Sequence, residues 1–431
     1  MLVNFSIQNF GSIKDKQTLS FEADKSKHLE DYYVMNVNGL RLLKLGLIYG
    51  ANASGKTTIL KALDFLRTLV LNPKTQKTET FNFEPFLLDE NTPTENTVFE
   101  IEFIQNETRY LYEVELNKEA IVREKLDVYN SRKSNVFERT TDFQIKIAKI
   151  EFGNKIKISK SAEDALENNT LWNNTVLGGY LKTNVASKEL KDLIDWFNGY
   201  LSPLVHTQTT LDAFITSQIN SSKIKKETLV SILKKADFNI SNILIKEKEF
   251  EIPKISIILD GKSKSAIHEL NKEQKFSVEL EFEHTVGNNK YLLPFNNESQ
   301  GTQRYYGFAG ILSLLIGNSI MFSIDELESS LHPDLFQHFL LSFLVNSNKS
   351  QLIATTHNRE ILNNKDIFRN DVIWITDKDN ENSATELYSL ADFSTNVIRD
   401  TTNILNAYKL GKLGGTPNLG SYYINIDNES E

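Results

Sequence analysis

The sequence contains no cysteine, which excludes disulfide bonds and thiolate metal ligands. It also lacks any apolar run of about 18 residues, so no membrane-spanning helix is predicted. The opening residues Met1–Ile7 are too polar and too short for a signal peptide. Together these absences favour a cytoplasmic protein in a reducing compartment.

An excess of basic residues is also missing. The chain has 57 acidic and 48 basic residues, a formal net charge of −9. This balance argues against a surface that binds nucleic acid throughout, although a local basic patch stays open. The 431 residues exceed what one hydrophobic core usually organises, so two domains, or one domain with a large insertion, are expected.

One glycine-rich stretch, Gly50–Thr58, lies between a strand pattern and a helix pattern. It reads Gly-Ala-Asn-Ala-Ser-Gly-Lys-Thr-Thr and follows the apolar run Leu42–Tyr49. After it, apolar residues recur at helical spacing, at Ile59, Leu63, Leu66 and Val70. A strand, a glycine loop and a helix in this order predict a loop that binds the phosphates of a nucleoside triphosphate.

The chemistry of the loop positions supports this prediction. Gly50 and Gly55 let successive backbone amides turn toward phosphate oxygens, and the following helix adds its positive end. Lys56 is expected to contact the β- and γ-phosphates, and the Thr57 hydroxyl is expected to ligate Mg²⁺. The remaining candidate nucleotide contacts in the loop are Asn52 and Thr58.

A second nucleotide motif is predicted at Ile320–Glu326, an apolar strand that ends in two acids. Asp325 is placed to hold Mg²⁺, and Glu326 is placed to orient or deprotonate the attacking water. Phosphoryl transfer to water needs both, because the metal neutralises charge while the base positions the nucleophile. The motif is weak alone and strong when paired with the loop at Lys56.

The rest of the chain alternates between strand and helix patterns. Antiparallel hairpins are predicted where apolar residues alternate between Phe99 and Tyr129. Residues 132–165 are rich in Lys, Asn, Ser and Glu and are expected to be irregular. From residue 165 to residue 236 the period is helical, with Ser187 as an expected helix N-cap.

Strands are predicted to resume after the helical stretch. They are expected at Ile243–Ile245, Ile255–Leu259 and Phe276–Phe282. His284 continues the apolar face of the last strand and is expected to be a buried, hydrogen-bonded histidine rather than a ligand. Heptads are not sustained, so a long coiled-coil arm is not expected.

The order of the motifs resembles that of the ABC-type ATPases. Ser299–Thr302, Ser-Gln-Gly-Thr, is similar to their signature loop in degenerate form, with Gln300 and Thr302 in place of the usual glycine and glutamine. His357 is similar to their switch histidine. Ser329–Leu331 resembles the D-loop that crosses a dimer interface.

Among these ATPases the chain resembles the SMC/RecF/OLD-like branch. Within that branch it is similar to the AAA ATPases of restriction and abortive-infection operons, including PARIS-type and AbiL-type anti-phage systems. The resemblance covers nearly the whole chain outside the stretch 155–250, and it departs at Gly11, where many relatives carry a basic residue. The stretches that carry it are Phe5–Ile13, Pro85–Asp89, Glu298–Thr302, Ile324–Pro333, Thr355–Asn358 and Tyr408–Gly414.

The resemblance implies an α/β fold, an ABC-type P-loop ATPase head with a mixed sheet, an antiparallel β-subdomain and a helical insertion. The implied division is an N-lobe at 1–155, a mainly helical insertion at 156–250 and a C-lobe at 251–431. It further implies ATP and Mg²⁺ as cofactors and Glu326 and His357 as catalytic residues.

The resemblance also implies partners. Ser299 and the Gly301 amide would cap the γ-phosphate bound to the opposite subunit, so a homodimer or higher oligomer is expected. The stretch after Val372 is too short for an added metal-dependent nuclease domain. A separate nuclease-like effector and a phage-encoded trigger are therefore expected partners.

Three other functions use similar motifs. A RecF-like ATPase of DNA repair or chromosome maintenance would bind duplex DNA, with lysines between Lys223 and Lys235 near phosphates. A transporter ATPase fits the motifs but not the long separation of Thr57 from Ser299. A kinase or GTPase is disfavoured, because no guanine-reading Asn-Lys-x-Asp follows a late strand and His357 would be unexplained.

Overall fold

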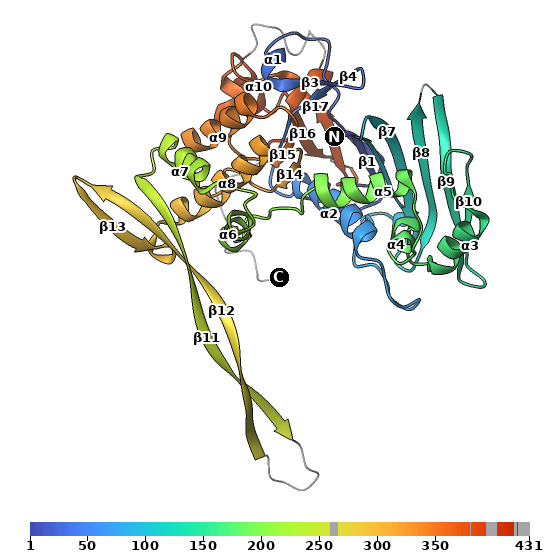
Figure 1. Cartoon of the computed structure of the whole chain (residues 1–431). Coiled ribbons are helices and arrows are strands. Elements are labelled where there is room, and N and C mark those ends of the chain that lie inside the picture. The colour runs from blue at the N-terminus through green and yellow to red at the C-terminus, as the bar shows by residue number, and fades with distance from the viewer. Residues whose placement is uncertain (131, 259–265, 380, 394–402, 418–419, 421–431) are drawn as a thin grey trace, which may run out of the picture. The chain divides into compact units, whose positions relative to one another are not determined.

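The computed structural model describes residues 1–130, 132–258, 266–379, 381–393, 403–417 and 420 (Figure 1). The chain divides into two compact units. The first holds Met1–Thr207, Leu315–Ser329 and Phe343–Glu431, and the second holds Gln208–Leu314 and Ser330–Ser342. In the part of the chain that the structure describes, no helix combines the length and the apolar character needed to cross a membrane.

The first unit contains a five-stranded sheet with the order β14-β15-β5-β16-β17. Its first four strands are parallel, and β17 runs antiparallel to β16. Every residue of β14, β15 and β5 is buried, as is typical of a parallel sheet covered on both faces. The strands are β5 (Leu45–Gly50), β14 (Met321–Ile324), β15 (Gln351–Thr355), β16 (Ile373–Lys378) and β17 (Thr385–Ser389).

The first unit also contains a seven-stranded antiparallel sheet with the order β10-β9-β8-β7-β6-β1-β2. The predicted hairpins between Phe99 and Tyr129 are confirmed as β6, β7 and β8. The strands are β1 (Leu2–Gln8), β2 (Gln17–Ser20), β6 (Thr97–Gln105), β7 (Thr108–Leu116), β8 (Ile121–Asn130), β9 (Arg132–Asp142) and β10 (Ile147–Phe152).

The prediction that residues 132–165 are irregular was wrong. This stretch forms β9 and β10, followed by helix α3 (Lys160–Asn169). Strand β10 alternates between buried and exposed positions, because only one face of the sheet edge is covered. Its exposed face carries the polar residues that gave the stretch the composition of a loop.

Helices of the first unit follow the expected periodicity. Helix α2 (Lys56–Leu71) buries Ile59, Leu63 and Leu66 on one face. The predicted N-cap is confirmed, because the Ser187 hydroxyl accepts a hydrogen bond from the Leu190 amide at 3.3 Å. The other elements are α4 (Val176–Tyr180), α5 (Lys188–Asp195), the π-helical turn η2 (Trp196–Tyr200), α1 (Glu30–Tyr33), β3 (Val34–Val37), β4 (Leu40–Leu43), α10 (Ile404–Lys409) and the short turns η1 (Thr92–Thr94), η4 (Glu360–Asn363), η5 (Asn370–Val372) and η6 (Leu390–Asp392).

The second unit is dominated by a long two-stranded ribbon, β11 paired antiparallel with β12 (Figure 1). At about 3.3 Å per residue, β11 spans roughly 60 Å. At its base, the rings of Phe282 and Phe295 pack against Tyr306 with centroids 5.2 and 5.5 Å away. The elements are α6 (Asp212–Asn220), α7 (Lys226–Lys235), β11 (Ile240–Ile258), β12 (Ala266–Val286), β13 (Asn289–Pro294), η3 (Phe295–Asn297), and helices α8 (Gln300–Gly317) and α9 (Pro333–Asn346), which begin in this unit.

The compact units are divided differently from the expected N-lobe, insertion and C-lobe. The helical stretch of the expected insertion at 156–250 ends at Lys235, and strand β11 begins at Ile240. The three strands predicted between Ile243 and Phe282 belong to two continuous strands, with Leu259 outside the described residues. Short apolar runs interrupted by charged residues in the sequence conceal the length of the two strands.

Candidate functional site

The phosphate-binding loop begins where β5 ends, at the carboxyl edge of the parallel sheet. A Cβ atom on Gly50 would lie 2.3 Å from the Thr376 hydroxyl and 2.4 Å from the Ser54 hydroxyl. Gly55 has φ +100°, and a Cβ there would lie 2.1 Å from the Thr385 hydroxyl. Both glycines are therefore required by close packing, and Gly55 also by its backbone conformation.

Hydroxyl groups from the last two strands of the sheet hold this loop. The hydroxyls of Ser54 and Thr376 are 2.6 Å apart, and Thr376 donates to the Tyr49 carbonyl at 3.1 Å. Thr385 donates to the Ser54 carbonyl at 3.0 Å and to the Ser12 hydroxyl at 2.7 Å. The loop is thus fixed by residues more than 300 positions away in the sequence.

The Lys56 side chain folds back over the phosphate loop, toward the residues with which the loop begins. Its Nζ donates to the carbonyls of Gly50 at 3.0 Å and Ala51 at 2.9 Å. Burial lowers the pKa of Lys56, and the nearby carboxylates of Glu326 and Asp325 oppose that shift. The loop therefore encloses one amine that faces two acids, and this arrangement suits a triphosphate with its metal ion.

The two predicted metal ligands lie side by side. The Thr57 hydroxyl donates to the two carboxylate oxygens of Asp325 at 3.0 and 3.2 Å. Mg²⁺ is commonly held by one or two protein oxygens together with substrate phosphates and water. The donor pair fits that chemistry, because both ligands offer oxygen at the entrance of a loop shaped for phosphate.

Thr355 joins the two acids of the motif. Its hydroxyl donates to Asp325 at 2.6 Å and accepts from the Glu326 amide at 2.8 Å. Thr355 ends strand β15, next to β14, so the pairing of these parallel strands sets where both acids point. Neither the composition nor the spacing of the sequence identified Thr355 as part of the site.

Glu326 and His357 face one another across the open side of the site. His357 Nε2 lies 4.0 Å from Glu326 Oε1, and their side chains are 38% and 45% exposed. Glu326 has φ +48°, a left-handed conformation that is uncommon for a residue other than glycine and that often marks a functional position. The two predicted catalytic side chains are thus placed together and remain accessible.

The charges around His357 compete. Burial lowers its pKa first, and the Lys56 ammonium lowers it further. The carboxylates of Glu328 and Glu326 oppose this shift, and the His357 amide also donates a hydrogen bond to Glu328. At neutral pH the ring is therefore held in its neutral form, with a nitrogen able to donate one hydrogen bond.

The predicted signature residues belong to the second unit. The Ser299 hydroxyl accepts from the Thr302 amide at 3.1 Å, so it caps the N-terminus of α8. Glu298, next to it, is bonded to His284 at 2.6 Å. His284 is therefore hydrogen-bonded as predicted, although its side chain keeps 23% of its exposure. Gly301 follows in the first turn of the same helix.

Asn9 and Gly11, in the turn after β1, contact two different segments of the first unit. The buried side chain of Asn9 accepts from the Phe86 amide at 2.9 Å and donates to the Thr92 carbonyl at 2.8 Å. Gly11 has φ +58°, and a Cβ there would lie 2.9 Å from a Thr58 methyl group. The departure from the family pattern at Gly11 thus has a local reason, because this position touches the phosphate loop.

A parallel sheet whose neighbouring strands end in a phosphate loop, an Asp-Glu pair and a histidine has the arrangement of a P-loop nucleotide-binding domain. Residues 47–363 match the AAA_21 family, described as "AAA domain, putative AbiEii toxin, Type IV TA system". The chain belongs to this family.

Solved SMC heads are distant structural neighbours. An SMC head domain from Thermotoga maritima is 13% identical with a TM-score of 0.41, over 90% of this chain and 98% of that one. An SmcHead bound to the C-winged helix domain of ScpA is 12% identical with a TM-score of 0.43, over 90% and 97%. An Smc head with an extended coiled coil from Pyrococcus furiosus, bound to the C-terminal domain of ScpA, is 11% identical with a TM-score of 0.40, over 96% and 98%. No curated protein matches the chain.

The electrostatics of His357 give a direct test of the site. Lys56→Met removes a nearby positive charge, so the pKa of His357 should rise. Glu326→Gln removes a negative charge, so the same pKa should fall further below its usual value of about 6.5. Both shifts are measurable by NMR titration of the imidazole ring, assigned with a His357→Gln variant. Shifts in the opposite directions would show that Lys56 and Glu326 do not face His357 in solution.

Proposed function

We propose that the chain is an ATP-binding and ATP-hydrolysing switch that acts as sensor or scaffold in an anti-phage defence system and controls a separate toxic effector. The observation that carries the proposal is the convergence of Lys56, Thr57, Asp325, Glu326 and His357 at one edge of the parallel sheet. These five residues come from three strand ends and supply the groups that phosphoryl transfer to water requires.

In this proposal, each residue has a separate task. Lys56 exchanges its bonds to the Gly50 and Ala51 carbonyls for the β- and γ-phosphates of ATP, which keeps its charge paired. Thr57 and Asp325 hold Mg²⁺, which neutralises negative charge on the phosphates. Glu326 orients the attacking water and accepts its proton, while neutral His357 donates a hydrogen bond to the γ-phosphate.

The proposed switch is a dimer. The groups around Lys56 surround the triphosphate from one side only, and Glu326 and His357 remain open to solvent. We infer that Ser299 and the Gly301 amide of a second copy close the site, since the amides at the start of α8 suit an anion. The γ-phosphate is then the contact that differs between the closed and open dimers, and its loss on hydrolysis opens them.

The description of the family and the resemblance to PARIS-type and AbiL-type systems support the proposed defence role. We propose that a phage-encoded trigger changes the ATP-bound assembly and that a nuclease-like effector, encoded separately, carries out the toxic reaction. The purified chain should therefore leave supercoiled and linear DNA uncut with ATP, Mg²⁺ or Mn²⁺. Specific cleavage by the purified chain, whether or not the Lys56→Ala variant abolishes it, would contradict an effector acting in trans.

Two substitutions separate binding from hydrolysis. Lys56→Ala should abolish ATP binding in calorimetry, because the loop loses the ammonium group that is proposed to contact the β- and γ-phosphates. Glu326→Gln should retain ATP affinity, lower the rate of hydrolysis by about 10²–10⁴-fold and accumulate a dimer in light scattering with ATP. If Glu326→Gln hydrolysed ATP at the wild-type rate, Glu326 would not be the base.

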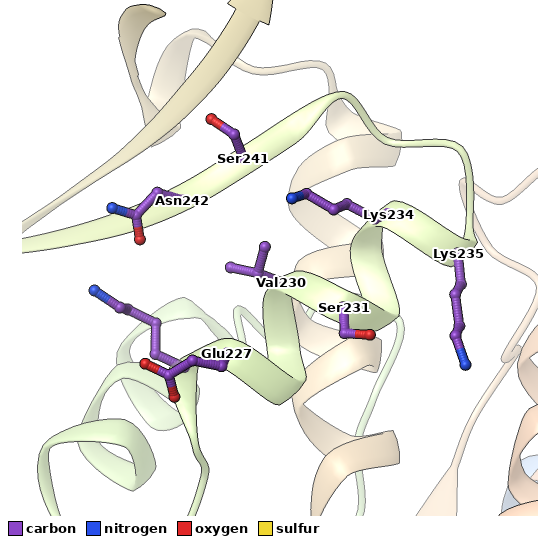
Figure 2. Close-up of a pocket in the computed structure, with 8 residues that line it drawn as sticks. Glu227, Val230, Ser231, Lys234, Lys235, Ser241 and Asn242 are labelled. Carbon is purple, nitrogen blue, oxygen red and sulfur yellow. The ribbon is translucent and has the colours of Figure 1, made fainter.

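A second candidate function, DNA binding as in a RecF/SMC-like repair ATPase, is favoured by one groove. The groove has a volume of about 600 Å³ and lies in the second unit between α7 and the start of β11 (Figure 2). In Figure 2, Lys234 extends toward the strand that carries Ser241, whereas Lys235 points away from it. Three of the eight lining residues are lysines, Lys226, Lys234 and Lys235. An ammonium-lined groove suits a phosphate backbone.

The groove can be tested by charge reversal. If it binds duplex DNA, the Lys234→Glu/Lys235→Glu variant should bind more weakly and with a smaller salt slope, by roughly 0.9 for each phosphate that the variant no longer neutralises. A matched control is Lys77→Glu/Lys349→Glu, which makes the same change of charge at exposed lysines outside the groove. If both variants bound duplex DNA equally weakly, the groove would not be the DNA-binding site.

A further inference from the structure

The segment that follows helix α10 forms a tight turn rich in glycine. Gly411, Gly414 and Gly415 have φ values of +71°, +68° and +64°. These are left-handed conformations, which glycine adopts at little cost and other residues avoid. We call residues 411–415 the closing turn.

The closing turn packs directly against the start of the phosphate loop. A Cβ atom on Gly415 would lie 2.7 Å from the Ile375 Cγ2, 3.2 Å from the Thr376 carbonyl oxygen and 3.3 Å from the Gly50 Cα. Gly50 itself has no room for a side chain on the side that faces Thr376. Gly415 therefore has no room for a side chain, and its backbone lies close to the backbone of Gly50 and Thr376.

Two tyrosine hydroxyls hold the closing turn from different elements. Tyr408, in α10, donates to the Gly415 carbonyl at 2.8 Å in a buried position. Tyr388, in β17, donates to the Leu413 carbonyl at 3.0 Å. The Tyr408 ring also meets the Tyr49 ring edge to face, with centroids 6.2 Å apart, and Tyr49 directly precedes Gly50. Tyr408 thus contacts both the closing turn and the strand that leads into the loop.

The closing turn and the phosphate loop line one cavity. Its volume is about 580 Å³, and one part of its lining is Gly50, Ala51 and Asn52. Another part is formed by Tyr408, Gly415 and Thr416. His357 lies on the same cavity, so the closing turn borders the region in which the triphosphate is proposed to bind.

We propose that Tyr408 is a positioning residue for the nucleotide site, holding Gly415 against Gly50 and thereby setting the conformation in which the phosphate loop receives ATP. This inference rests on the proposed function. The coupling is reciprocal: ATP in the loop stabilises the closing turn, and a partner that draws the closing turn away from Gly50 weakens ATP binding by the same factor.

The test compares Tyr408→Phe with Tyr388→Phe. Each substitution removes one hydroxyl that donates to the closing turn, so each should lower the thermal midpoint without nucleotide by a similar small amount. Only Tyr408→Phe should raise the Kd and the KM for ATP, by about three- to tenfold, the cost of one hydrogen bond. Its kcat should stay unchanged, because no group that meets the reacting atoms is altered.

Hydrogen exchange of the wild-type chain supplies the second measurement. Saturating ATP should slow amide exchange in residues 408–417, and this protection should be smaller in Tyr408→Phe. Unchanged exchange in this segment, or an equal rise in Kd for both tyrosine variants, overturns the inference. Failure of the wild-type chain to bind ATP at all is a different result, which rejects the proposed function itself.

Discussion

The first unit depends on one contact, the close approach of the phosphate loop to strands β16 and β17. The Ser54 and Thr376 hydroxyls meet at 2.6 Å beneath the loop, and Gly50 leaves no space there for a Cβ atom. A loop that exposes successive amides to an anion repels itself when empty, so it needs rigid support before the ligand arrives. The two strands give that support, and the early and late parts of the chain must come together before the site exists.

The same five-stranded sheet positions the acidic residues of the site. Strands β14 and β15 pair in parallel, so the acids after one strand and Thr355 at the end of the other are brought together without any long side chain. The Thr355 hydroxyl then fixes the Asp325 carboxylate and the Glu326 backbone at once. Glu326 and His357 lie on the open side, where their side chains stay 45% and 38% exposed.

The sequence predicts those site residues that belong to a motif with a characteristic spacing. The loop at Gly50–Thr58, the acids Asp325 and Glu326, and His357 each follow a recognisable apolar strand, and the structure brings them together. Single hydroxyls cannot be found in this way. Thr355, Thr376 and Thr385 act through contacts of more than one strand, and nothing in their local sequence separates them from ordinary threonines.

The errors in the fold have a common cause. Strands β9 and β10 carry polar residues at exposed positions, and charged residues interrupt the apolar runs of β11 and β12, so the composition of these strands is that of loops and short strands. For Ser299, the structure of one chain shows only one of the two roles that were considered. Its role as the cap of α8 is visible in one chain, whereas the role implied by family resemblance requires a second chain.

The proposed switch requires that ATP join two copies of the chain through a composite site. Because the sequence has no cysteine, single cysteines introduced separately as Ala53→Cys and Gln300→Cys in a Glu326→Gln background report only this contact, and both positions are exposed and have no proposed side-chain contact with the nucleotide. Mixing the two variants with a short bifunctional maleimide should give a cross-linked pair with ATP and little with ADP, while neither variant alone should cross-link to itself. A mixed cross-link that forms equally without nucleotide, or none with ATP, would contradict the account.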